Sequence, residues 1–162
     1  MTMADKHIVC DPELCVGCQT CEFACSGAKE GYYDPLHSRI RHVRIEPTLM
    51  LAVACRTCED APCVACCPRR ALSQDEATGV IRVDNDRCDG CAWCIEACEF
   101  GAIALDPARK RVAICDLCSD RETPACVELC PKEALTLSTP ELVAQRTRKG
   151  VVAKLLAELS ER

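Results

Sequence analysis

Four groups of four cysteines constrain this chain more than any other feature of its sequence. The first and third groups follow the pattern C-x2-C-x2-C-x3-C. The second and fourth are stretched to C-x2-C-x4-C-x3-C and C-x2-C-x7-C-x3-C, and a proline follows each of them. In chain order the four groups are Cys15, Cys18, Cys21 and Cys25; Cys55, Cys58, Cys63 and Cys67; Cys88, Cys91, Cys94 and Cys98; and Cys115, Cys118, Cys126 and Cys130.

Disulfides, zinc and iron–sulfur clusters are the three chemistries that use many cysteines. No signal-like segment opens the chain, so we expect a reducing cytoplasm, which disfavours a disulfide scaffold. Zinc sites use C-x2-C pairs that usually lie a dozen or more residues apart. In the bacterial ferredoxin run, by contrast, three cysteines bind one cluster and the fourth binds the other. The spacing favours iron–sulfur clusters, and a zinc-bound interaction scaffold is the minor alternative.

The number of cysteines predicts the number of clusters. Four groups supply sixteen thiolates, which suffice for four [4Fe–4S] clusters at four ligands each. Of the eighteen cysteines, Cys10 and Cys66 then remain as spares. We expect Cys10 to be a buried small residue on the first strand. Cys66 directly precedes Cys67, but the spacing from Cys63 and the proline at position 68 favour Cys67 as the ligand.

A repeated unit of loop, helical turn and hairpin predicts an α+β fold. The three residues between the last two cysteines of each group suit one helical turn. Hairpins are expected between residues 71–72 and 80–83, and between 103–105 and 111–114, across Asp106-Pro107. Two such units make one bacterial-ferredoxin-like domain, so four predict two domains. Aromatic residues are only 3% of the chain, so we expect the clusters themselves to form much of the core.

Two segments depart from the repeat. Residues 39–45 alternate basic and apolar, which predicts a half-exposed strand that ends at Glu46-Pro47, and residues 49–54 predict a more buried partner. The basic face either docks a partner or, as we favour, is simply solvated. The tail, residues 138–162, predicts a helix capped by Ser138 or Thr139, with Pro140 in its first turn. Gly150 interrupts it, so two helical pieces are expected.

One face of this tail helix is apolar, with Val152, Leu155, Leu156 and Leu159 at helical spacing. This stripe packs on the chain's own domains or docks a partner subunit or another copy. Trp93, inside the third group, either covers a cluster or belongs to the core. Four basic residues beside ligands are positioned to raise cluster potentials locally: Arg56, Arg69, Arg70 and Lys132.

Several functions are disfavoured. The formal net charge of −5 offers no basic surplus for nucleic acid, and no apolar run approaches the length of a membrane helix. The three histidines, His7, His37 and His42, fall outside the cysteine groups, and no Gly-rich phosphate loop follows a strand. The sequence therefore predicts a non-catalytic electron carrier.

The cysteine pattern resembles a known family over about residues 8–137. The segments Cys55-Arg56-Thr57-Cys58-Glu59-Asp60-Ala61-Pro62-Cys63 and Cys115-Asp116-Leu117-Cys118 are particularly similar to the four-cluster polyferredoxin subunits of molybdenum- or tungsten-pterin oxidoreductases. Related carbon monoxide dehydrogenase, formate dehydrogenase and hydrogenase systems share the pattern. In its small size, without large insertions or a membrane-anchor feature, the chain resembles the small iron–sulfur subunit of a bacterial tungsten-dependent aldehyde oxidoreductase complex.

The resemblance implies that groups one and four exchange their last ligands, as do groups two and three. Residues 1–54 with 115–137 would then form one domain, and residues 55–114 the other. The implied ligand sets, in the order of the family's wire, are Cys15, Cys18, Cys21 and Cys130; Cys25, Cys115, Cys118 and Cys126; Cys55, Cys58, Cys63 and Cys98; and Cys67, Cys88, Cys91 and Cys94. Glu99 departs from the family, because a proline usually follows this cysteine.

The resemblance also implies partners: a catalytic oxidoreductase subunit and a further redox subunit or ferredoxin, with end-to-end stacking of copies as a variant. A free polyferredoxin that shuttles between enzymes is the alternative, although a free carrier has little need of an apolar tail.

Overall fold

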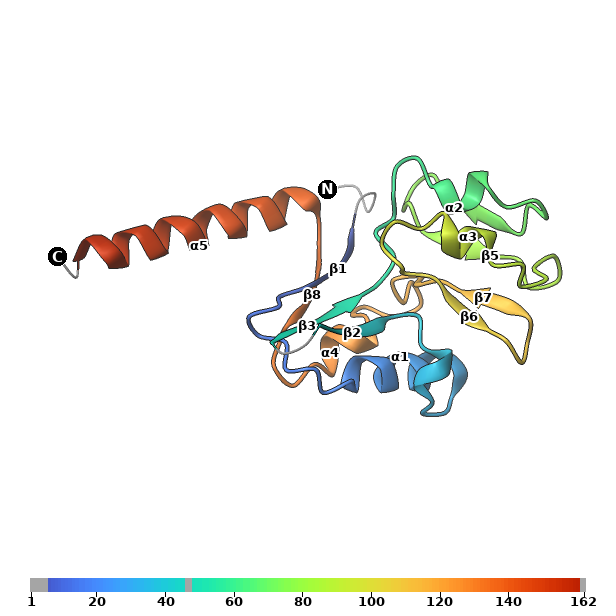
Figure 1. Cartoon of the computed structure of the whole chain (residues 1–162), viewed down its shortest axis with the longest axis horizontal. Coiled ribbons are helices and arrows are strands. Elements are labelled where there is room, and N and C mark those ends of the chain that lie inside the picture. Colours follow the sequence, from blue (N-terminus) through green and yellow to red (C-terminus); the bar gives the residue numbers. More distant parts are fainter. Residues whose placement is uncertain (1–5, 46–47, 161–162) are drawn as a thin grey trace.

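The computed structural model describes residues 6–45 and 48–160 and confirms a small mixed α/β body from which one long helix projects (Figure 1). The eight described strands form four two-stranded antiparallel sheets. Their strands are β1 (His7–Cys10) with β8 (Leu135–Ser138), β2 (Arg41–Ile45) with β3 (Leu49–Val53), β4 (Leu72–Gln74) with β5 (Ile81–Val83), and β6 (Ala104–Asp106) with β7 (Arg111–Ala113).

Each cysteine group contains a helix. In three groups the helix is a single turn: α2 (Pro62–Ala65), α3 (Trp93–Glu96) and α4 (Ala125–Glu128). In the first group α1 (Thr20–Glu30) runs on past the last cysteine and ends at Gly31, whose φ of 77° lets its N–H bond to the carbonyl of Gly27. The expected helical turns and both expected hairpins are confirmed. One detail differs: Asp106 belongs to β6, so the second hairpin turns after it.

The first strand pairs with the last strand, although most of the chain separates them. Strand β1 lies beside β8, with His7 opposite Ser138 and Cys10 opposite Leu135. Helix α1 packs against α4, and α2 packs against α3. These contacts bring the first cysteine group to the fourth and the second to the third (Figure 1).

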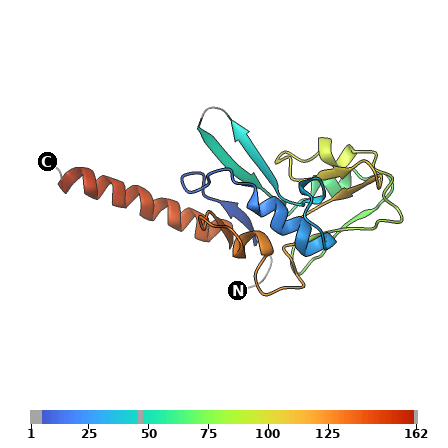
Figure 2. The same ribbon diagram turned by 90° about the horizontal axis from the view of Figure 1, so that it is seen from below.

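The insertion after α1 forms a short 3₁₀ turn, η1 (Pro35–His37), and the β2–β3 hairpin, which stands out from the body in Figure 2. The expected end of the first strand at Glu46-Pro47 falls at residues outside the described ones. Within β3 only Ala52 is fully buried, and the predicted strand stops one residue early, at Val53.

Cysteine takes much of the place that large apolar residues hold in other interiors. Eight ligand candidates are buried, together with small and β-branched residues such as Ala71, Ile81 and Ile114. The largest side chain that is almost fully buried is Ile40. Trp93 is 61% exposed, so of its two alternatives the core role is wrong. Its ring lines a hollow together with Cys67, Cys88, Cys91 and Cys94, as the alternative of covering a cluster requires.

Helix α5 (Pro140–Ser160) is continuous, and the expected break at Gly150 does not occur. A single glycine costs only about 1 kcal/mol in a helix, which twenty other residues outweigh. Thr139 provides the cap, accepting a hydrogen bond from the N–H of Leu142 at 3.4 Å, while Ser138 remains in β8. The structure describes every residue of α5, and none of them is buried. In the described parts of the chain, no helix has the length and apolar character to cross a bilayer.

Candidate metal centres

Three of the four implied ligand sets each line a hollow in the body. The first set, Cys15, Cys18, Cys21 and Cys130, lines a hollow that is shared with Cys10, Gly17, His42 and Lys132. The third set, Cys55, Cys58, Cys63 and Cys98, lines a second hollow. The fourth set, Cys67, Cys88, Cys91 and Cys94, lines a third. In each hollow, three thiols come from one cysteine group and the fourth thiol comes from another.

The second set, Cys25, Cys115, Cys118 and Cys126, is buried throughout. Burial is the main cause that raises the pKa of Cys115 to about 12, and the nearby Cys25 thiolate contributes. Burial also raises the pKa of Cys126, with further contributions from Cys115, Cys25 and Cys118. The thiols shift one another's pKa values because they lie close together, as the packing of α1 against α4 also shows.

One buried cation stands beside this second set. The Lys29 ammonium lies 3.0 Å from Asp116 and 2.6 Å from Asp120. Burial by itself lowers the pKa of Lys29, but its bonds to the two carboxylates outweigh burial and leave the pKa above its ordinary value. Lys29 therefore stays charged. Burial raises the pKa of Cys118, and the Lys29 charge offsets only part of that rise.

The loops that carry the ligands share an unusual backbone. Gly17 and Gly90, each directly before the second cysteine of its group, have φ values of 68° and 72°. Gln19 and Ala92, directly after that cysteine, are also left-handed. In the other two groups Thr57 and Leu117 take this conformation before the second cysteine. Such turns curl the chain so that successive thiols point to one side.

The segments that follow Cys67 and Cys98 have the same backbone hydrogen bonds, although Pro68 follows the first cysteine and Glu99 the second. The N–H of Ala71 donates to the Sγ of Cys67 at 3.3 Å, and that of Ala102 donates to Cys98 at 3.4 Å. Gly101 bonds back to the carbonyl of Cys98 as Arg70 does to Cys67, both at 3.1 Å. Glu99 therefore leaves the local fold unchanged, because the left-handed Gly101 closes the same turn without a proline.

The four sets follow one another in space: the first lies near the second, the second near the third, and the third near the fourth. The Cys21 thiolate of the first set contributes to the raised pKa of Cys126 in the second, after burial and the second set's own thiols. Cys55 of the third set contributes in the same way at Cys115 of the second. Burial raises the pKa of Cys63 to about 12, and Cys94 of the fourth set is among the lesser causes.

Exposure differs along that order. All eighteen cysteines lie in the described parts of the chain, and only Cys18 and Cys91 are exposed. Cys18 belongs to the first set and Cys91 to the fourth. The hydroxyl of Thr20 donates to the Cys18 sulfur at 3.3 Å, and this bond is the main cause that lowers the pKa of Cys18. The two outer sets thus each present one thiol to solvent.

Both spare cysteines lie beside the outer sets. Cys10 lines the hollow of the first set, and burial is the main cause that raises its pKa to about 11. Cys66 is near the fourth set, where its thiolate contributes, after burial, to the raised pKa of Cys94. Its own Sγ donates to the carbonyl of Cys63 at 3.4 Å.

The basic residues beside the ligands differ in their surroundings. The Arg56 guanidinium lies over the ring of Phe100, 5.5 Å from the ring centre, at the hollow of the third set. Arg69 pairs with Asp89 at 3.8 Å. Lys132 lines the hollow of the first set, whereas Arg70 occupies one of the left-handed turn positions.

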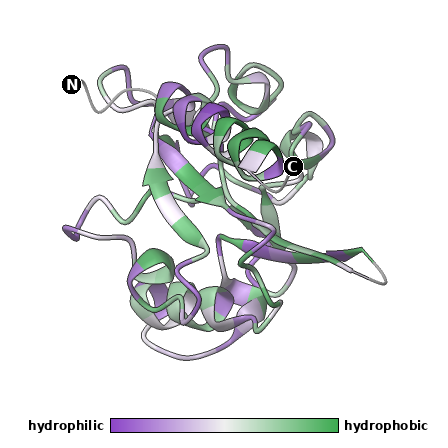
Figure 3. Ribbon diagram, turned by 90° about the vertical axis from the view of Figure 1, so that its left-hand side faces the viewer, coloured by the Kyte–Doolittle hydropathy of each residue, from purple (hydrophilic) through white to green (hydrophobic). Residues whose placement is uncertain are grey.

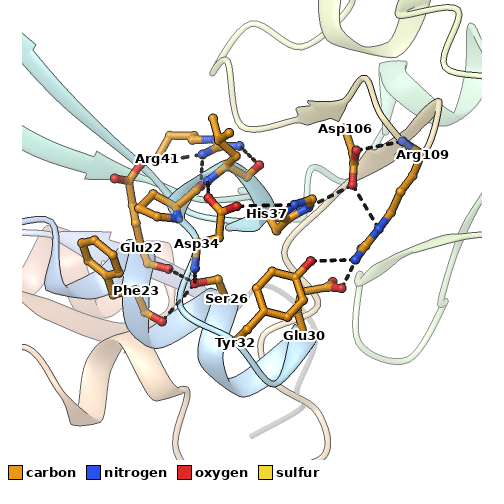
Figure 4. Close-up of polar contacts among 12 residues, drawn as sticks. Glu22, Phe23, Ser26, Glu30, Tyr32, Asp34, His37, Arg41, Asp106 and Arg109 are labelled. Carbon is orange, nitrogen blue, oxygen red and sulfur yellow. Dashed lines mark hydrogen bonds and ion pairs between the residues drawn. The ribbon is translucent and has the colours of Figure 1, made fainter.

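A polar network ties the insertion to the β6–β7 hairpin (Figure 4). The Nδ1 of His37 lies 2.9 Å from the carboxylate of Asp106. Arg109 reaches back to Glu30 at 2.7 Å and to the hydroxyl of Tyr32 at 2.6 Å. These bonds join the segment that follows α1 to the β6–β7 hairpin.

The residues present fit iron–sulfur clusters. Each set offers four sulfur donors, with backbone N–H groups directed at several of them, and the Cys25 sulfur likewise accepts from the N–H of Arg39 at 3.3 Å. Nowhere among the described residues do three His, Cys, Asp or Glu side chains converge as ligands of a single metal ion. When bound, such clusters would supply one-electron redox chemistry.

Sequence reasoning missed two residues of the first hollow. Cys10 was expected only as a buried strand residue, and His42 as a residue away from the cysteines. Cys10 precedes the first group but falls outside its ferredoxin spacing, and His42 lies in the insertion after α1, so neither residue gave a signal. Cys10 is half-buried rather than fully buried. The alternation of residues 39–45 did show that one face of that strand turns inward.

The comparisons with known proteins agree with this chemistry. The family described as the 4Fe-4S dicluster domain matches residues 47–139, more than half of the chain. The chain belongs to this family. It is 43% identical over 154 residues to the YsaA protein of Escherichia coli (strain K12), covering 89% of this chain and 96% of that one.

Two further relatives are subunits of named oxidoreductases. The polyferredoxin-like subunit of the aliphatic sulfonate oxidoreductase of Pyrococcus furiosus is 43% identical over 124 residues, which are 76% of this chain and 70% of that one. The thiosulfate reductase electron transfer subunit PhsB of Salmonella typhi is 36% identical over 138 residues, 77% of this chain and 71% of that one.

A solved structure shares the fold. The active site complex BamBC of benzoyl coenzyme A reductase, with benzoyl-CoA bound, contains a chain that matches with a TM-score of 0.51 and 21% identity. The match covers 97% of each chain.

Proposed function

We propose that the chain is a non-catalytic electron-transfer subunit that holds four [4Fe–4S] clusters on the four sets of cysteines. The observation that carries the proposal is that residues from separate groups line common hollows in the 3 + 1 combination that two-cluster ferredoxins use. The proposed ligands are the first to fourth sets as defined above, and Cys10 and Cys66 are not ligands.

The proposed domain division follows the same pairing. Residues 1–54 with 115–137 form one ferredoxin-like domain, and residues 55–114 form the other, each with an approximate internal twofold repeat. Matching bonds support the likeness of the two domains: the N–H of Asp11 bonds to the carbonyl of Ala134 in one, and that of Asp84 bonds to the carbonyl of Ala71 in the other, both at 2.7 Å. Residues 138–162 are a separate helical tail.

The proposed path for electrons runs through the sets in order, from the first to the fourth or in reverse. Electrons enter or leave most readily where a cluster approaches solvent, and Cys18 and Cys91 provide such points at the two ends. The inner sets are shielded, which keeps water from a reduced cluster and favours transfer along the chain over loss to solvent.

The proposed partner at one end is the catalytic subunit of an oxidoreductase, of the molybdenum- or tungsten-pterin class, in a cytoplasmic complex. A further redox subunit or ferredoxin serves the other end. The oxidoreductase names of two relatives support a complex, and so does the exposed apolar face of α5. A free shuttle is the second candidate, and it leaves that face unexplained.

The test begins with chain purified without oxygen. We expect a brown protein with about sixteen iron and sixteen acid-labile sulfide per chain, from four cubanes. Stoichiometric zinc without sulfide would refute the proposal. A tagged chain purified gently from its native cells should bring a molybdenum- or tungsten-containing subunit, identified by mass spectrometry and metal analysis. Recovery of a fully loaded chain alone would favour the free shuttle.

A further inference from the structure

A buried nitrogen without a partner faces the hollow of the first set. The Nε2 atom of His42 is inaccessible to solvent and has no hydrogen-bond partner among the described residues. A buried polar group in this state destabilises the fold unless something else satisfies it. His42 is also one of the residues that line the hollow with the first set.

The position of this ring is fixed from two sides. The backbone N–H of His42 donates to Glu22 Oε1 at 3.0 Å, and Glu22 is the neighbour of the ligand candidate Cys21 on α1. Across the β2–β3 hairpin, His42 pairs with Ala52. The strand is thereby anchored to the helix that carries the ligands, and the imidazole is held over the hollow.

The Nε2 atom is also directed at the ligand loop itself. A Cβ atom added to Gly17, between Cys15 and Cys18, would lie 2.9 Å from it. At the opposite end of the path, the corresponding Gly90 instead faces the backbone of Lys110, at 2.8 Å. The imidazole is therefore a feature of one outer site.

We infer that His42 donates a hydrogen bond from Nε2–H to a sulfur at the first set and raises the reduction potential of the cluster there. This inference rests on the proposed function. Thiolates and sulfides only accept hydrogen bonds, so the proton belongs on Nε2. Four thiols already suffice for four irons, which leaves the ring the role of donor. Hydrogen bonds to sulfur stabilise the more negative, reduced cluster.

The test compares His42→Phe with the parent chain and with His37→Phe as the matched control, because His37 bonds to Asp106 instead. We expect His42→Phe to lower one of the four potentials by about 59 mV, a tenfold change in a one-electron equilibrium. His42→Gln, which keeps an N–H donor, should recover part of the shift. The control should leave all four potentials in place.

A spectroscopic measurement on the parent protein makes the test independent of how the variants fold. In chain labelled with ¹⁵N-histidine and reduced by dithionite, pulsed EPR should detect a histidine nitrogen coupled to a reduced cluster. The coupling should survive in His37→Phe and vanish in His42→Phe. Fully loaded parent chain without the coupling, or unchanged potentials in fully loaded His42→Phe, would overturn the inference. A parent chain without iron and sulfide would instead refute the proposed function.

Discussion

The body and helix α5 use their apolar residues in opposite ways. In the body, buried cysteines pack with aliphatic side chains such as Ile8, Ile81 and Leu135, and none of the five aromatic rings is buried. In α5, Val151, Val152, Leu155, Leu156 and Leu159 are all more than half exposed. Figure 3 shows this part of the helix as hydrophobic, beyond a hydrophilic first half. The chain thus builds its interior around candidate ligands and leaves its longest helix uncovered.

The body and α5 also differ in what stabilises them. Bonds at the side of α5 are exposed, such as Lys154 to Glu13 at 3.2 Å and Arg146 to Thr136 at 3.1 Å, and pairs of this kind contribute little. The stability of the body depends on the groups that its thiols bind. The stability of α5 depends on packing against a partner, because the body covers none of its residues. Five experiments test this difference between the body and α5.

Removal of iron should have the largest effect. The free energy of cluster binding is also folding free energy when the ligands form the core, so the body should unfold under anaerobic chelation. NMR of the treated chain should lose the dispersed signals of the four two-stranded sheets, while α5 changes least. A well-dispersed apo spectrum from the body would contradict this.

The loss of one crossing ligand should remove one cluster. Cys67→Ala should damage the cluster at Cys88, Cys91 and Cys94, because Cys67 lines their hollow rather than that of its own group. The iron content should fall by about a quarter, with one EPR signal lost. The matched control is the adjacent Cys66→Ala, which should keep the full iron content, as should Cys10→Ala. Damage confined to the cluster at Cys55, Cys58 and Cys63 would show that the ligand exchange is wrong.

Truncation of the tail should affect assembly and leave the clusters intact. A stop after Thr139 keeps β8 and its pairing with β1, and removes α5. We expect unchanged iron content but loss of the complex with the catalytic subunit, or of self-association, in size-exclusion chromatography. Electron transfer to that subunit should fall with it. Unchanged assembly and turnover would mean that the apolar face of α5 is not an interface.

A methyl group at the loop glycine should destabilise the body locally. Gly90→Ala places a Cβ atom at a left-handed φ of 72° and 2.8 Å from the backbone of Lys110. The backbone conformation alone costs about 1–2 kcal/mol, and the overlap adds to it. Iron release in guanidinium should be faster. Gly101→Ala, at φ of 60° but with open space around it, is the control and should show only the smaller conformational cost.

The smallest effect is expected inside α5. Gly150 lies in the helix with no atom within 4 Å of an added Cβ. Gly150→Ala should therefore stabilise the helix by about 1 kcal/mol and raise the helical circular dichroism signal. Iron content and the rate of iron release should not change. An altered rate would show that α5 and the body are coupled in solution.

Local features were predictable from the sequence because they depend on neighbours along the chain. The helical turns within the cysteine groups, both hairpins and the Thr139 cap follow from spacing, turn residues and capping chemistry. The alternatives that place Trp93 in the core and a break at Gly150 are wrong, because local pattern does not settle either feature. Burial of a ring and continuity of a helix depend on layers and energies that local pattern does not contain.

By itself, the sequence determined the chemistry of this protein: four groups of thiols at ferredoxin spacing, each followed by a turn and a short strand. Only the tertiary structure decided which groups meet, because β1 and β8 pair across nearly the whole chain and bring Cys130 to Cys15. It also decided that Cys10 and His42 face the first set, and that α5 stands uncovered. Spacing fixes what a thiol can bind, whereas packing of distant segments fixes the neighbours that tune and connect it.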